Sequence, residues 1–469
     1  MTGGAWEGQN ALTLKPEPAP LNLVLRGGTV VTPDGERRTD LGLSGGRIAA
    51  LGKDLVGRAD FDASGLHLLP GGVDMHVHFN DPGRADWEGW DSGSRAALAG
   101  GVTTVVDMPL NASPPTVNAE ALWLKREAAR RSYADYALWG GLVQGNVAEL
   151  AELHAGGVAG FKAFMIDSGM PDFAFVEGEH LREGMAEIAR LGGLLLVHAE
   201  DQALVAANVA ALRTAGRRDP LAWAQAHSVE AEVRAVRAAL DLARATGCRL
   251  HVVHVSTPEA VDLITAARAA GQAVTLETCP QYLTLTEDDL VRLGPLGKCA
   301  PPPRDPARVE ALWDRVRAGL VDAIASDHSP SPLALKTPGE ADIWAAWGGV
   351  QGVQTLLPLT LTDGLRRGLD LTALARLLST NPARIAGLEN RKGALTPGLD
   401  ADITAVRLNA PWTLAPQDLL YRHPHSPYLG RELSVRVERV WLRGREVYDG
   451  GRVLGDAGGQ FLNALEVRA

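Results

Sequence analysis

The chain has 469 residues, enough for one large domain and a smaller one. Its 56 acidic residues outnumber its 46 basic ones, the net charge is −10, and no basic run occurs, so nucleic acid is not an expected partner. Since no apolar stretch reaches the ~18 residues that span a bilayer, no membrane partner is expected either. The 3 cysteines form no CxxC pair, which favours a reducing, cytoplasmic setting.

Apart from the first 20 residues, both ends of the chain have the composition of small β-structures. Residues 1–20 are expected to be a flexible leader with prolines and no fold of its own. Residues 21–70 contain short apolar runs between Gly and Asp-Gly turn signals, which is typical of hairpins. Residues 388–469 return to that pattern. We therefore predict one small β-sandwich domain built from both chain ends and split by the intervening segment.

Residues 71–387 alternate buried-strand runs with helical segments rich in Ala and Leu. The expected strands are 72–78, 102–108, 137–144, 158–165, 194–200, 250–256, 273–278 and 323–328. Helices are expected at 92–99, 119–131, 181–191, 228–245, 258–270 and 306–318. Eight β-then-α repeats predict an α/β fold of the (β/α)8 TIM-barrel type. The alternative is a doubly wound sheet, but such a sheet usually has a Gly-rich phosphate turn after its first strand, where this chain has a His-x-His motif.

The His-x-His motif consists of His76 and His78 in the first barrel strand. Side chains alternate along a strand, so both imidazoles point to the same face and can bind one divalent metal. Two core histidines with the same spacing are the alternative. Nearly every other predicted strand also finishes on a reactive side chain, at the end where a barrel of this type has its active site. These residues are Asp107, Lys162, His198, His254, Thr278 and Asp327.

The set of four histidines and Asp327 exceeds the three protein ligands of a single catalytic zinc, which points to two metals about 3.5–4 Å apart. Lys162 lies between aromatic residues near a strand end, where burial lowers the pKa of an amine. A neutral amine can take up carbon dioxide as a carbamate, whose two oxygens can bridge two metals. The alternative is a lysine whose amine extends to the barrel rim.

Six segments together resemble the cyclic amidohydrolases, which include the dihydroorotases, hydantoinases and allantoinases. They are DMHVHFNDPGR (74–84), GFKAFM (160–165), LLLVHAED (194–201), LHVVHVS (250–256), ETCPQYL (277–283) and ASDHSP (325–330). The resemblance extends over residues 22–450. It implies a barrel with a composite β-domain, a homotetramer and a binuclear centre of divalent ions, zinc first and cobalt, manganese or iron as alternatives. The implied metal ligands are His76, His78, Lys162 (as N6-carboxylysine), His198, His254 and Asp327.

Within this family the pattern is closest to the allantoinases. Asn80 stands where dihydroorotases usually carry an arginine for a substrate carboxylate, and the segments 107–111, 298–302, 347–350 and 426–430 also match. Two departures are Gln281, where His is more frequent, and the sequence around His227, where Ser-Arg-Pro is usual. The expected small-molecule substrate is therefore a cyclic ureide, with (S)-allantoin hydrolysed to allantoate.

The expected reaction is attack by a hydroxide that bridges the metals, with Asp327 as general base and then general acid. Asn80, Asn111 and Thr278 are the candidate substrate contacts, while Thr278 and Asn111 can alternatively serve only to close turns. A hydantoinase (dihydropyrimidinase) or dihydroorotase activity is the alternative within the family. A non-catalytic scaffold should have lost some of the six ligands, and this sequence retains them all.

Overall fold

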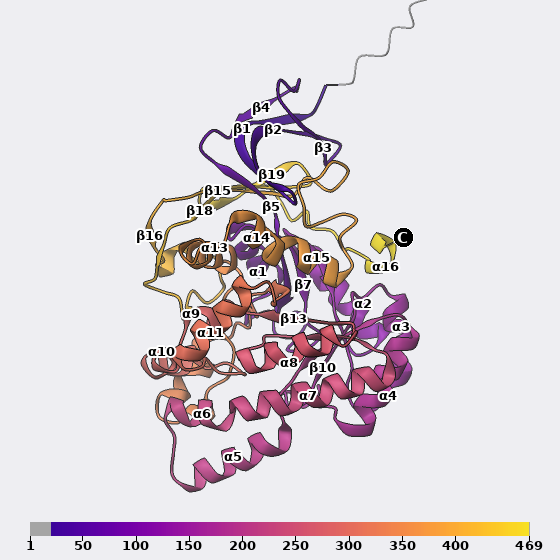
Figure 1. Cartoon of the computed structure of the whole chain (residues 1–469), viewed down its shortest axis with the longest axis vertical. Helices are drawn as coiled ribbons and strands as arrows, with labels where there is room; N and C mark the ends of the chain where they lie inside the picture. Colours follow the sequence, from indigo (N-terminus) through magenta and orange to yellow (C-terminus); the bar gives the residue numbers. More distant parts are fainter. Residues whose placement is uncertain (1–19, 469) are drawn as a thin grey trace, which may run out of the picture.

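The strand that carries the His-x-His motif continues directly from a sheet at the end of the molecule. The computed structural model describes residues 20–468. β5 (His67–Pro70) lies in that sheet, and β6 (Gly72–Val77) is the first barrel strand. Gly71 joins them where space is lacking, because a Cβ there would lie 2.2 Å from Oγ1 of Thr103. Figure 1 shows the sheet-rich part above the barrel and its helices.

The barrel strands are all parallel and form two sheets, β6-β7-β8 and β9-β10-β11-β12-β13-β14. They are β7 (Val102–Asp107), β8 (Asp135–Leu138), β9 (Gly140–Gly141), β10 (Phe161–Phe164), β11 (Leu194–His198), β12 (Arg249–Val252), β13 (Val274–Thr278) and β14 (Ala323–Ile324). β8 and β9 flank Trp139 and together make the third of eight barrel positions. A bridge between Val77 and His328 closes the ring, and the predicted α/β barrel is confirmed.

The six predicted helices are present and cover the barrel. They are α1 (Trp90–Ala99), α2 (Ala119–Ala128), α4 (Gly178–Arg190), α7 (Val229–Thr246), α8 (Pro258–Ala269) and α11 (Pro306–Arg317). The side chains of Asn118, Ser228, Thr257 and Asp305 accept backbone N–H groups at four of their N-termini, which is a favourable cap. Further helices are α3 (Leu150–Ala155), α5 (Gln202–Thr214), α6 (Pro220–Ala226), α9 (Pro280–Thr284), α10 (Glu287–Leu293), α12 (Leu333–Lys336), α13 (Leu356–Arg366), α14 (Leu371–Ala375), α15 (Asn381–Ala386) and α16 (Ala464–Arg468). Among residues 20–468, no helix has the length and apolar character needed to cross a bilayer.

Most predicted strands end earlier than expected, and two of them end four residues early. The ladder of β12 stops at Val252 and that of β14 at Ile324, so His254 and Asp327 lie beyond their strands. Both residues have positive φ angles, 38° for His254 and 47° for Asp327, which an extended strand does not accommodate. Strained backbone of this kind concentrates at functional sites.

Strands from both chain ends hydrogen-bond into one nine-stranded sheet, which confirms the composite β-domain. Its order is β20-β19-β18-β15-β5-β1-β2-β3, and β4 pairs with β1. The strands are β1 (Leu23–Thr32), β2 (Gly35–Ser44), β3 (Arg47–Gly52), β4 (Asp60–Asp62), β15 (Ile403–Arg407), β18 (Arg436–Leu442), β19 (Arg445–Asp449) and β20 (Arg452–Val453). β16 (Trp412–Thr413) and β17 (Glu432–Leu433) form a separate pair. The domain limits at residues 70 and 387 stay a prediction, and residues 1–19 of the predicted leader lie outside the described residues.

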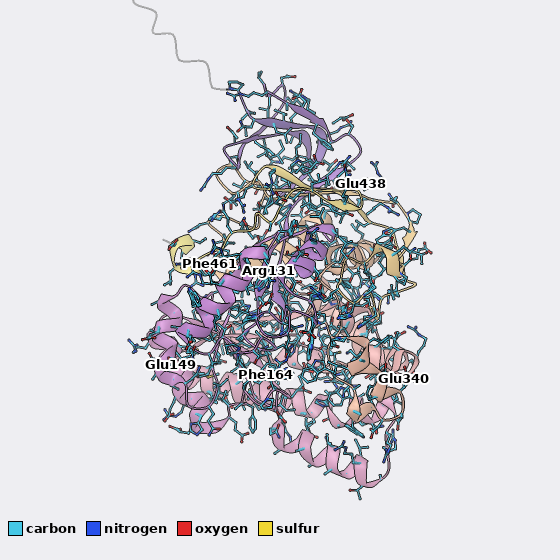
Figure 2. All side chains as sticks on the ribbon, turned by 180° about the vertical axis from the view of Figure 1, so that it is seen from behind. Arg131, Glu149, Phe164, Glu340, Glu438 and Phe461 are labelled. Carbon is cyan, nitrogen blue, oxygen red and sulfur yellow. The ribbon has the colours of Figure 1, made fainter. Side chains whose placement is uncertain are left out.

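The C-terminal segment also contacts the barrel directly. Lys392 Nζ lies 2.6 Å from Asp135 of β8 and 2.6 Å from Asp402, beside β15, so one buried ammonium joins the two parts. Phe461 forms a β-bridge with Tyr136, and Figure 2 shows it beside the barrel helices at the end of the chain.

Candidate metal centre

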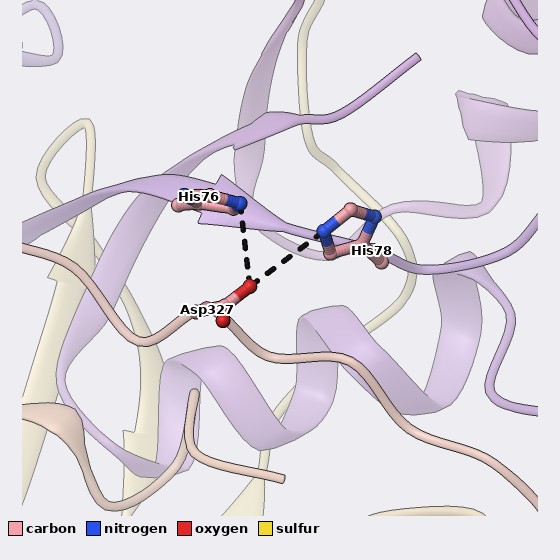
Figure 3. Close-up of side chains that lie close together, drawn as sticks. All are labelled: His76, His78 and Asp327. Atoms are coloured by element: carbon pink, nitrogen blue, oxygen red, sulfur yellow. Dashed lines mark ion pairs between the residues drawn. The ribbon is translucent and has the colours of Figure 1, made fainter. Parts of the chain in front are cut away.

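His76, His78 and Asp327 meet at the mouth of the barrel (Figure 3). Oδ1 of Asp327 lies 3.3 Å from Nε2 of His76 and 3.7 Å from Nε2 of His78. One ligand atom from each of the three residues lies within 4.8 Å of the others, and all three side chains are buried. Two imidazoles and a carboxylate at this spacing fit a divalent metal. His76 and His78 thus lie close together, as expected if both imidazoles point to the same face of one strand.

His198 and His254 extend this group into a continuous cluster of imidazoles. The ring centroids of His76 and His254 are 5.4 Å apart, and those of His198 and His254 are 4.5 Å apart. Burial lowers the pKa of His76 and His198 and lowers that of His254 far below the usual value. The three rings are therefore neutral at pH 7, the form in which imidazole binds metal.

Lys162, on β10, is fully buried beside this cluster. Among the residues that the structure describes, its Nζ has no hydrogen-bond partner. Burial lowers the pKa of Lys162 to about 7, although the carboxylates of Glu277 and Asp327 act in the opposite direction. The Nζ lies 5.1 Å from the ring of Phe164, which stacks on His198 and is labelled in Figure 2. A buried amine with a pKa near 7 exists about half in the neutral form at pH 7, and its burial excludes the alternative of a lysine whose amine extends to the rim.

Two glutamates that we did not single out from the sequence support the histidines. Oε1 of Glu277 lies 2.5 Å from Nδ1 of His76, and Oε2 of Glu200 lies 2.7 Å from Nε2 of His198. Burial alone would raise the pKa of each carboxyl, but the adjacent imidazoles lower it below its ordinary value. Such carboxylate–imidazole contacts fix which ring nitrogen faces a metal. The sequence signal is a glutamate inside or just after a buried strand.

The candidate substrate contacts differ in their free hydrogen-bonding capacity. Asn80 donates from Nδ2 to the carbonyl of Pro330 at 3.1 Å, while its buried Oδ1 has no partner within residues 20–468. Asn111 is buried with a φ of 67°. The hydroxyl of Thr278 donates to the carbonyl of Val255 at 2.7 Å, which is a structural contact. The Oδ1 atom of Asn80 is thus available to accept a hydrogen bond from a substrate.

Asp107 and Arg84 make structural contacts near the cluster. Asp107 accepts the backbone N–H of Phe79 at 2.8 Å and pairs with Lys125. Arg84 donates to the backbone carbonyl of Asn111 at 2.7 Å. Asp81 pairs with Arg131, from the 3-10 turn that follows α2, a contact between distant segments that local spacing does not reveal.

Solved structures and curated relatives resemble this chain over most of its length. The L-hydantoinase (dihydropyrimidinase) of Arthrobacter aurescens superposes with a TM-score of 0.91 at 35% identity and covers 94% of this chain and 99% of its own. The dihydropyrimidinase of Brevibacillus agri gives a TM-score of 0.88 at 28% identity, with 94% and 98% covered. Allantoinases of Rubrobacter xylanophilus and Solibacter usitatus are 49% and 45% identical and cover 94% of this chain. The matched regions make up 97% and 96% of the lengths of these two allantoinases.

The barrel, its buried His-His-Asp group and these similarities agree with a match to the amidohydrolase family over residues 67–447. That match covers more than half of the 469 residues. The chain therefore belongs to the amidohydrolase family.

Proposed function

We propose that this chain is a metal-dependent hydrolase that opens the ring of (S)-allantoin to give allantoate. The main support for a metal centre is the state of Lys162, which is a fully buried amine with a pKa near 7 and no hydrogen-bond partner among the described residues. A carbamate on Nζ replaces a buried cation by an anion that needs cations nearby. This supports a binuclear centre over a packing role for the cluster.

The side chains present fit two divalent ions, of which zinc is our first choice. His76, His78, His198, His254, Asp327 and the carbamate of Lys162 would hold them. Neutral imidazoles, a carboxylate and a carbamate suit zinc, and also cobalt, manganese or iron. When bound, such ions supply Lewis acidity and lower the pKa of a water molecule to about 7.

Asp327 is the residue that we propose moves the proton. Its Oδ1 faces His76 and His78, and its Oδ2 accepts a hydrogen bond from the side-chain amide of Gln281 at 3.4 Å. Asp327 takes a proton from the attacking water as the new C–O bond forms. It then gives that proton to the ring nitrogen as the C–N bond breaks, so one carboxylate serves both steps.

Neutral hydrogen-bonding groups are proposed to hold the substrate. The free Oδ1 of Asn80 can accept an N–H of the ureide, and Asn111 and Thr278 are the further candidates. Allantoin carries no carboxylate, so an amide at position 80 suits it. The curated allantoinases at 40–49% identity support this substrate.

A substrate panel tests the proposal. Purified, metal-loaded protein is assayed with allantoin, hydantoin, dihydrouracil and dihydroorotate, and allantoin is expected to have the highest kcat/KM. Asp327→Asn is the control, because it keeps the size of the side chain and should abolish turnover of all four. Allantoin turning over no faster than hydantoin would transfer the assignment to a hydantoinase, the activity named for the similar structures. No turnover of any substrate would refute the hydrolase.

We also propose a homotetramer in the cytoplasm. The family resemblance supports the tetramer. Cys248, Cys279 and Cys299, which are buried free thiols, support a reducing compartment. Sedimentation of the purified protein tests the oligomeric state.

A further inference from the structure

His227 lies behind the candidate metal centre and is not one of its proposed ligands. It follows α6 directly and is buried. Its Nδ1 lies 2.8 Å from Oε1 of Glu200, whose other oxygen, Oε2, lies 2.7 Å from Nε2 of His198. One fully buried carboxylate is thus shared by two imidazoles, and only one of these belongs to the proposed ligand set.

We propose that His227 is a positioning residue that orients His198 through Glu200. This inference rests on the proposed function, because it assigns a role toward the bound metals. Since Glu200 accepts the N–H at Nε2 of His198, the nitrogen left with a lone pair for a metal is Nδ1. A carboxylate held at one oxygen only can rotate. The hydrogen bond from His227 fixes the second oxygen and with it the plane of the His198 ring.

His227 is itself held from several sides, as a positioning role requires. Arg304 donates from Nη1 to its backbone carbonyl at 2.6 Å, and the ring of Trp223 lies 4.0 Å from its own ring. The Nζ of Lys298 lies 4.0 Å from the centroid of the same Trp223 ring. Arg304 is in turn fixed by Glu232 at 3.1 Å. The imidazole of His227 therefore has little freedom to leave Glu200.

The sequence around His227 departs from the Ser-Arg-Pro pattern that is usual in the family. An arginine is a permanent cation with several donors, whereas His227 offers one N–H from Nδ1 to one oxygen. The contact to Glu200 therefore depends on the placement of a single ring nitrogen.

Zinc affinity of the full-length protein tests the proposal. Zinc is titrated into the metal-free protein in competition with a chromophoric chelator. His227→Ala is expected to bind zinc about 10–100-fold more weakly, as is typical when a residue behind a metal ligand is removed. His227→Asn, whose side-chain N–H can replace Nδ1–H, should stay within about 3-fold of the wild type. His180→Ala, at an exposed histidine of α4, is the matched control and should bind like the wild type.

Melting temperature and kinetics separate positioning from a purely structural role. At saturating zinc, His227→Ala should lower kcat with little change in KM. If His227→Ala does not fold, His227→Leu fills the space without a donor and takes its place. A variant without the donor that binds zinc like the wild type, whatever its melting temperature, would overturn the proposal, as would His227→Asn that binds as weakly as His227→Ala. Wild-type protein that binds no zinc would instead refute the proposed function, and this role with it.

Discussion

Gln281 donates a hydrogen bond from its side-chain amide to Oδ2 of Asp327 at 3.4 Å. The amide oxygen accepts from the hydroxyl of Tyr428 at 3.3 Å, and burial raises the pKa of Tyr428 far above its usual value, so the hydroxyl stays a donor. Tyr428 comes from the C-terminal segment, so residues from distant parts of the chain together orient the proposed proton carrier. Gln281 is a neutral group at a position where the family more often has a histidine.

Removing the amide should slow the chemical step. We expect Gln281→Leu to lower kcat about 10-fold, because a hydrogen bond to a charged group is worth at least ~1.5 kcal/mol. KM should change little, since Asp327 is proposed to move a proton and not to bind the substrate. Tyr428→Phe should have a smaller effect, and the double variant should be no slower than Gln281→Leu alone.

Steady-state kinetics on the three variants checks this prediction. Tyr448→Phe, in β19 of the nine-stranded sheet, is the matched hydroxyl deletion and should leave kcat unchanged. Additive losses in the double variant would show that Tyr428 acts independently of Gln281, contrary to the geometry.

Asn80→Gly should weaken substrate binding without straining the backbone. The φ of Asn80 is 63°, a conformation that glycine adopts readily, so this substitution removes the side-chain amide and its hydrogen bond to Pro330 while the backbone conformation is kept. Loss of one accepted hydrogen bond predicts a KM about 10-fold higher, with kcat changed less. Asn409→Gly, at an exposed asparagine with a φ of 53°, is the control. An unchanged KM would exclude Asn80 from the substrate site.

Lys336 should make stability depend on pH above neutrality. Burial lowers the pKa of Lys336 to about 7, and its Nζ donates to the carbonyl of Gly349 at 2.5 Å. In the unfolded chain the lysine keeps its proton to about pH 10. Between these values the unfolded state binds one more proton, so the free energy of unfolding rises with pH, by at most about 1.4 kcal/mol per unit.

Urea unfolding at pH 7, 8 and 9 measures this slope. Lys336→Met lacks the titrating group, so its slope should be smaller than that of the wild type, and its stability relative to the wild type should be greatest at pH 7. Equal slopes for the two proteins would contradict the lowered pKa of Lys336.

Lys392 should be essential for the contact between the composite sheet and the barrel. It lies within 2.9 Å of Asp135, Asp400 and Asp402, all of them buried, and these carboxylates raise its pKa although burial opposes this. Lys392→Met leaves the carboxylates without this ammonium and is expected to cost about 3–5 kcal/mol. Calorimetry should therefore show a clearly lower melting temperature for Lys392→Met. Lys53→Met, at an exposed lysine, should leave the melting temperature almost unchanged. Equal melting temperatures for both variants would show that the cluster contributes nothing.

The barrel and the position of the site could be predicted because they depend on local patterns. Alternation in a strand places His76 and His78 on one face, and parallel strands bring their ends to one mouth. The ends of β12 and β14 could not be predicted. The positive φ angles at His254 and Asp327 are imposed by surrounding structure and not by residue type.

The residues behind the ligands were missed for a different reason. Glu277 reaches His76 from another strand, and Glu200 connects His198 with His227, which lies 29 positions further along the chain. Such contacts depend on side-chain directions in the folded barrel, which sequence spacing does not contain. The contacts of Arg84 with the carbonyl of Asn111 and of Asp81 with Arg131 depend on the folded chain in the same way.

Lys162 is the residue through which the binuclear centre is tested most directly. A crystal structure of the protein loaded with zinc in the presence of bicarbonate should show a carboxylated Nζ and two ions about 3.5–4 Å apart. Lys162→Ala should lose zinc and activity, with partial recovery of both on addition of a short carboxylic acid. A free amine at Lys162 with fewer than two ions in the site, or a Lys162→Ala variant with unchanged zinc content and activity, would contradict the proposed centre.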